Sequence, residues 1–189
     1  MRQNLANIVV IPAAKLSGKG ITAYASLIQG VPYQVYSPGY LKVGVALHES
    51  SHSMDSYALR DVVVSLGYPA GTDYSKTKNF QGAWQKDSNV VTAYSTTNWA
   101  ENFAEVGQYL GVPNIVIPGG VGSGKYGDGW KKVANQMGNY QARLESLIFP
   151  SSSGQCTFKV PTTSAVRYGS ERRVPEHPGD VIMHEPLSV

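Results

Sequence analysis

The sequence predicts an α+β fold, with a small and mostly N-terminal sheet followed by helices. Two short apolar runs, Ile8–Ile11 and Tyr33–Tyr36, are bounded by prolines and are typical of strands. Further along, apolar residues recur at spacings of four and seven, which is the period of a helix. We expect one domain over residues 1–149. Residues 150–189 form a Ser- and Pro-rich C-terminal tail, which we predict to be poorly ordered.

Helix stop signals divide the region after the predicted strands. The first helix runs from about Leu41 to Leu66, and its apolar stripe consists of Val43, Leu47, Met54 and Ala58. A short helix is expected around Trp84. The next runs from Asn98 to Leu110, where Gly111 and Pro113 close it, and the last covers roughly residues 129–148. The glycine-rich segment 119–124 lacks the ending of a phosphate-binding loop, so we interpret it as a linker.

Composition and charge exclude several classes of function. A net charge of +3 with no long basic run does not favour nucleic-acid binding. No apolar stretch approaches the roughly 20 residues that span a bilayer. The single cysteine, Cys156, cannot form an internal disulfide. We expect a monomer with no membrane or nucleic-acid partner. The low charged fraction, with 12 Tyr and 20 Gly, favours a secreted protein.

The residues that suggest chemistry begin with the motif His48-Glu49-Ser50-Ser51-His52. Two histidines four apart on a helix project side by side, so both rings can reach one metal ion at about 2.0–2.1 Å. Glu49 projects toward the flank, where it could act as general base on a water. The alternative is a polar helix face that carries two histidines by coincidence, for instance on an all-helical binding domain.

A catalytic zinc site needs a third protein ligand and one open position. His177 and His184 lie in the tail and are poor candidates, whereas Glu101 and Glu105 form an i, i+4 pair on the helix that begins near Asn98. Both carboxylates lie opposite the apolar stripe of that helix. An alternative stays open, because Glu101 could instead complete a capping box with Asn98, and Glu105 could be a solvated charge.

The combined spacing of these residues resembles the anthrax-lethal-factor-like zinc metallopeptidases, and in particular the compact Pro-Pro endopeptidases and fungal conidiation-associated secreted proteins. The resemblance covers roughly residues 30–112. It implies a zincin-like metallopeptidase domain that cleaves a peptide or protein substrate with one Zn²⁺ per chain. It further implies that Glu101 is the third ligand beside the two histidines, that Glu105 supports the site, and that Tyr94 stabilises the oxyanion. The resemblance also implies an extracellular protein whose signal peptide is absent from this chain.

Asp55 lies one helical turn beyond His52, where it could accept the ring N–H of a ligand histidine and fix its tautomer. An ordinary solvated aspartate is the alternative. The competing function is a non-catalytic secreted protein on a zincin scaffold. Because a purely structural zinc site would need only the three ligands, the presence of Glu49 favours the enzyme.

Overall fold

The computed structural model describes residues 7–10, 22–28, 31–37, 39, 42–122 and 127–148, and its architecture is mixed α+β. Three strands form one sheet in the order β1 (Asn7–Val10), β3 (Val31–Tyr36) and β2 (Ala23–Ile28). β1 runs parallel to β3, and β2 runs antiparallel to it. The two predicted strands are confirmed as β1 and β3, whereas β2 lies outside the predicted strands. The sheet therefore ends in an antiparallel edge strand.

The first predicted helix is confirmed, although its hydrogen bonding changes along its length. α2 (Val43–Ser53) continues into a π-helical turn, η2 (Met54–Ala58), and then into α3 (Arg60–Ser65). The chain leaves α3 at Gly67, whose φ of +84° is a conformation that favours glycine. Gly67 is thus the stop that the sequence predicts.

Short helices connect α3 to the helix that carries Glu101 and Glu105. They are η3 (Tyr74–Lys76), α4 (Lys78–Trp84) and η4 (Ala93–Thr96), and they lead into α5 (Trp99–Val106). After the loop that contains Gly119 and Gly120, the chain forms η6 (Gly129–Val133) and α7 (Ala134–Ile148). The predicted short helix and the predicted last helix are therefore both confirmed.

The predicted end of the second helix at Gly111 and Pro113 is wrong. α5 continues through a π-helical segment, η5 (Gly107–Gly111), into α6 (Val112–Val116). The π turn shifts the hydrogen-bond register, so Pro113 falls in the first turn of α6, where its missing N–H is not required. Gly111 keeps a helical φ of −62°. It is needed for packing, because a Cβ there would lie 2.3 Å from the Tyr140 ring.

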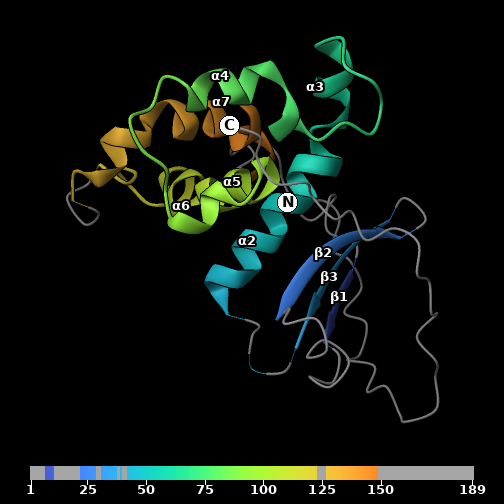
Figure 1. Ribbon diagram of the computed structural model, residues 1–189. Coiled ribbons are helices and arrows are strands. Elements are labelled where there is room, and N and C mark those ends of the chain that lie inside the picture. Colours follow the sequence, from blue (N-terminus) through green and yellow to red (C-terminus); the bar gives the residue numbers. More distant parts are fainter. Residues whose placement is uncertain are drawn as a thin grey trace, which may run out of the picture.

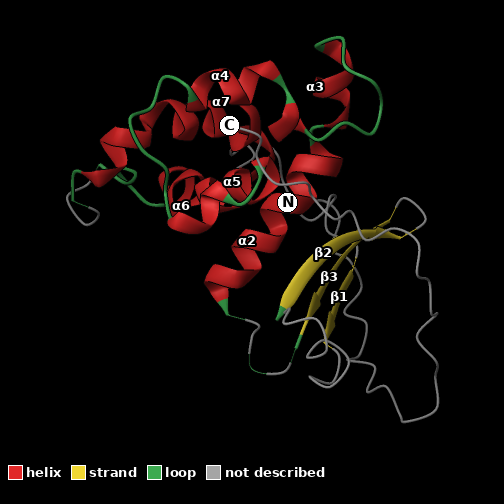
Figure 2. Ribbon diagram, viewed as in Figure 1, coloured by secondary structure: helices red, strands yellow, loops and turns green. Residues whose placement is uncertain are grey.

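An aromatic cluster at the centre of the helical part holds the helices together. Phe103 of α5 packs with ring centroids 5.2 Å from Phe80, 4.9 Å from Tyr140 and 6.1 Å from Tyr74. These four rings are completely buried. Figure 1 shows α2 running between this helical part and the sheet, and Figure 2 shows the same division by secondary structure. α2 packs against β2 and β3 on one side and against α5 and η5 on the other.

Among the described residues, no helix has the length and apolar character needed to cross a membrane. The predicted tail at 150–189 and the middle of the glycine-rich linker, 123–126, lie outside the described residues.

Candidate metal centre

The two histidines of the motif lie together on α2, as their i, i+4 spacing predicts. The Nε2 atoms of His48 and His52 are 3.2 Å apart, and the two rings meet edge to face with centroids separated by 4.8 Å. Both side chains are largely buried, at 11% and 14% exposure. Two imidazole nitrogens therefore point into one small space between α2 and α5.

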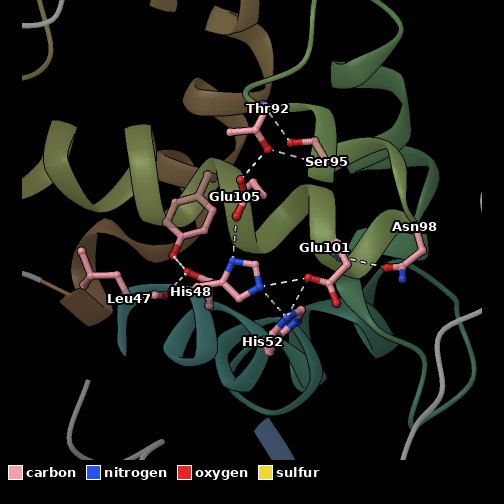
Figure 3. Close-up of polar contacts among 10 residues, drawn as sticks. Leu47, His48, His52, Thr92, Ser95, Asn98, Glu101 and Glu105 are labelled. Carbon is pink, nitrogen blue, oxygen red and sulfur yellow. Dashed lines mark hydrogen bonds and ion pairs between the residues drawn. The ribbon is translucent and has the colours of Figure 1, made fainter. Parts of the chain in front are cut away.

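α5 supplies two carboxylates that face His48 from opposite sides of its ring (Figure 3). Glu101 Oε2 lies 2.9 Å from His48 Nε2 and 3.4 Å from His52 Nε2. Glu105 Oε1 lies 2.9 Å from His48 Nδ1. The i, i+4 spacing of the two glutamates on α5 thus matches the two nitrogens of a single imidazole.

The N-terminus of α5 shows that capping and ligation are compatible for Glu101. The Asn98 side chain accepts a hydrogen bond from the Glu101 backbone N–H at 2.9 Å, so Asn98 is the N-cap. The Glu101 carboxylate is directed at the histidines. The cap fixes the backbone of Glu101 while leaving its carboxylate for the histidines.

Glycine lets the two helices approach closely enough for these contacts. A Cβ on Gly107 would lie 2.1 Å from Ser51 Oγ and 2.7 Å from the Tyr140 hydroxyl oxygen. Ser51 Oγ donates to the Leu47 carbonyl at 2.8 Å and lies 3.0 Å from the Tyr140 hydroxyl. Ser51 and Gly107 are therefore the contact point of α2 with η5, next to the histidines.

The three atoms His48 Nε2, His52 Nε2 and Glu101 Oε2 have the spacing of metal ligands. Their mutual separations are 2.9, 3.2 and 3.4 Å. Tetrahedral coordination at about 2.0–2.1 Å places ligand atoms about 3.3 Å apart. Within the described residues these three side chains are the one cluster compatible with a bound metal ion. The set of two imidazoles and one carboxylate is also the donor set of a catalytic zinc site.

The charges at this cluster are strongly coupled. Burial lowers the pKa of His48, but hydrogen bonds to Glu101 and Glu105 more than compensate and raise that pKa to about 9. Burial raises the pKa of Glu101, but the hydrogen bonds from His48 and His52 outweigh it and hold the pKa well below its usual range. Without a metal, a proton on His48 supplies the positive charge between the two carboxylates.

Glu49 is buried beside the cluster and faces the sheet. Burial is the main cause that raises its pKa, and the nearby charges of His52 and His48 oppose that shift. The Ala25 backbone N–H of β2 also lowers the pKa through a hydrogen bond to the carboxylate. The second oxygen, Oε2, is buried and has no hydrogen-bond partner among the described residues. Glu49 is therefore a carboxylate with one oxygen available, next to the candidate ligands and with raised basicity.

Tyr94 lies on η4, at the edge of the same cluster. Its ring centroid is 6.0 Å from that of His48, and 53% of the residue is exposed. Burial of part of the side chain is the largest cause that raises its pKa, followed by the negative charges of Glu101 and Glu49. The phenol therefore stays protonated near neutral pH and is accessible to a molecule that enters the site.

Asp55 is fully buried one turn beyond His52, and its Oδ1 accepts the Ser75 backbone N–H at 2.7 Å. Burial, followed by the charge of Asp73, holds the pKa of Asp55 well above its usual range. This hydrogen bond of Asp55 joins η2 to η3. The carboxylate that lies against the Nδ1 atom of a motif histidine is Glu105, at His48.

Two groups of site residues are absent from the sequence-based prediction. Gln34 of β3 donates to Ser50 Oγ at 3.1 Å and accepts from the Tyr36 hydroxyl at 2.6 Å, which fixes α2 to the sheet next to Glu49. Thr92 and Ser95 form a capping box at the start of η4. A Thr-x-x-Ser pattern before a helix was a signal for the second group. No local pattern indicates the first.

Comparisons of the chain with models of known protein families, with curated proteins and with solved structures found no match.

Proposed function

We propose that the protein is a zinc-dependent endopeptidase with a zincin-like catalytic domain. The observation that carries this proposal is the convergence of His48 Nε2, His52 Nε2 and Glu101 Oε2 at ligand spacing, with Glu49 buried beside them. A site that only bound zinc would have no use for a further acidic group with a free oxygen beside its three ligands. The resemblance of the motif spacing to the lethal-factor-like peptidases supports the same conclusion.

His48, His52 and Glu101 would hold the ion, and Glu105 would keep His48 in the tautomer that has its proton on Nδ1. When bound, zinc lowers the pKa of a coordinated water toward ~7 and polarises a carbonyl oxygen. Glu49 takes a proton from the attacking water and later transfers it to the leaving amine. Tyr94 donates its phenolic hydrogen to the oxyanion that develops on the scissile carbonyl.

The edge strand β2 offers a place for an extended peptide. β2 pairs with β3 on one side, and no described strand pairs with its other side. Its Ala25 N–H faces the Glu49 carboxylate. A peptide that added to this edge by backbone hydrogen bonds would bring its amide groups alongside Glu49. This arrangement favours an extended peptide segment as substrate.

We further propose that the enzyme acts outside the cell.

The test combines metal analysis with a peptide-library digest of the reconstituted protein. Wild type should bind one equivalent of zinc and cleave a subset of peptides. Glu49→Gln keeps the size of the side chain but removes the base, so it should bind one zinc and cleave almost nothing. Glu145→Gln, on the exposed side of α7, is the matched control and should behave as wild type.

Two results would overturn the proposal. Wild type that takes up well under one equivalent of added zinc has no such site. Zinc-loaded wild type that cleaves nothing across a broad library is a non-catalytic protein on this scaffold.

A further inference from the structure

Thr92 occupies the junction between the carboxylate that supports His48 and the helical turn that carries Tyr94. Its Oγ1 donates a hydrogen bond to Glu105 Oε2 at 2.5 Å. The same oxygen accepts the Ser95 backbone N–H at 3.3 Å, and the Thr92 backbone N–H donates to Ser95 Oγ at 3.3 Å. Figure 3 shows these contacts above His48.

The hydrogen-bond roles at Thr92 are fixed by its neighbours. The Ser95 N–H can only donate, and a carboxylate oxygen can only accept, so the single hydroxyl proton of Thr92 must point to Glu105. Glu105 then presents its other oxygen to His48 Nδ1 at 2.9 Å. A carboxylate in that position holds a proton on Nδ1 and leaves Nε2 directed at Glu101 and His52.

The second role of Thr92 is to start η4. Thr92 is the N-cap of this short helix, and Tyr94 is its second residue. Because a helix of four residues has few hydrogen bonds of its own, the cap is a large part of what holds its backbone. The cap therefore determines where the Tyr94 ring lies relative to His48, 6.0 Å away.

We propose that Thr92 is a positioning residue that couples the orientation of His48 to that of Tyr94. The inference rests on the proposed peptidase function. One hydroxyl fixes the tautomer of a metal ligand on one side and places the oxyanion donor on the other. Neither Ser95 nor Glu105 does both, since Ser95 bonds only within the cap and Glu105 reaches η4 only through the Thr92 hydroxyl.

The experiment compares wild type with three variants of the full chain for zinc affinity, the visible spectrum of the Co²⁺-loaded form, kcat and KM. Thr92→Val keeps the shape and loses the hydroxyl. It should weaken zinc binding by roughly 10-fold or more, alter the Co²⁺ spectrum, and lower kcat with little change in KM. Thr92→Ser retains the hydroxyl and should restore all these properties. Thr96→Val removes a hydroxyl from the same helix that bonds only the Ala93 carbonyl, and should match wild type.

Two further single variants and one double variant separate the effect of Thr92 on His48 from its effect on Tyr94. Ser95→Ala should lower kcat and leave zinc affinity unchanged, because the bond from Thr92 to Glu105 persists. Glu105→Gln should weaken zinc binding, and adding Thr92→Val to it should weaken it little further. If Thr92→Val binds zinc as wild type does, or if its effect adds fully to that of Glu105→Gln, the coupling is refuted. Failure of wild type to bind zinc would refute the peptidase proposal instead, before any variant is compared.

Discussion

Gly107→Ala tests whether the close contact of α2 with η5 determines the geometry of the metal centre. The new Cβ would lie 2.1 Å from Ser51 Oγ and 2.7 Å from the Tyr140 hydroxyl oxygen, far inside the ordinary contact range of 3.4–4 Å. Ser51 cannot turn away freely because its hydroxyl donates to the Leu47 carbonyl. The helices must therefore move apart, or the hydrogen bond between Ser51 and Tyr140 must break.

The expected loss of stability follows from these contacts. Overpacking of this kind costs ~1–3 kcal/mol, and a lost buried hydrogen bond adds about 1 kcal/mol, which gives roughly 2–4 kcal/mol for Gly107→Ala. At ~2–4 °C per kcal/mol for a chain of this size, the melting temperature should fall by roughly 5–15 °C. Zinc affinity should fall as well, because Glu101 and Glu105 move with α5. Thermal melting by circular dichroism, without metal, and a chelator competition measure the two effects.

The matched control is Gly138→Ala in α7, where an added Cβ would meet no heavy atom within 4 Å. Since alanine is the better helix former, this variant should be as stable as wild type or more so. If Gly107→Ala melts with the control and binds zinc equally well, the contact does not set the spacing of the site.

Four further outcomes are expected. Because the pKa of His48 is raised to about 9 without metal, zinc must displace a proton from it at neutral pH. Calorimetry in buffers of different ionisation heat should therefore count about one proton released per zinc even at pH 8. An unperturbed histidine would release almost none at that pH. Burial raises the pKa of Asp55 above its value in the unfolded chain, so the wild type loses stability as the pH rises above that unfolded-state pKa. Metal-free Asp55→Asn should therefore melt at a higher temperature than wild type at pH 8–9, and the difference should be smallest near pH 4. Glu101→Ala should abolish tight zinc binding while Glu105→Ala loses roughly 10–100-fold, and a reversed order in a zinc titration would exchange their roles. Tyr94→Phe should lower kcat by roughly 10²–10³ with little change in KM, whereas a raised KM at constant kcat would make Tyr94 a substrate contact.

Those parts of the site that follow from helical spacing could be predicted from the sequence. His48 and His52, like Glu101 and Glu105, are four residues apart, and helix geometry alone places each pair on one face. That the two faces meet was an inference from the chemistry of zinc, because no local rule positions α5 against α2. The close approach depends on Gly107, which has no sequence signature as a packing glycine.

Non-local packing decided the features that the sequence did not indicate. Gly111 and Pro113 have the composition of a helix stop, but the Tyr140 ring against Gly111 and the π turn allow the helix to continue. β2, with the sequence Ala-Tyr-Ala-Ser-Leu-Ile, shows no clear alternation, so pairing with β3 was not predictable from its own residues. The link from Thr92 to Glu105 joins residues thirteen apart on different elements.

The character of the residues that α2 buries has a consequence for local unfolding. The buried side chains of this helix are His48, Glu49, Ser50, Ser51 and Ser53, and none is apolar. Burial of polar groups contributes little hydrophobic driving force, so α2 is held mainly by hydrogen bonds to its neighbours, with partly buried Leu47 packing against the core. Amide hydrogens of α2 should then exchange with solvent through openings of lower free energy than those of α5 or α7. A ligand that joins α2 to α5 would slow the exchange of the α2 amides selectively, because it would bind only the closed arrangement of the two helices.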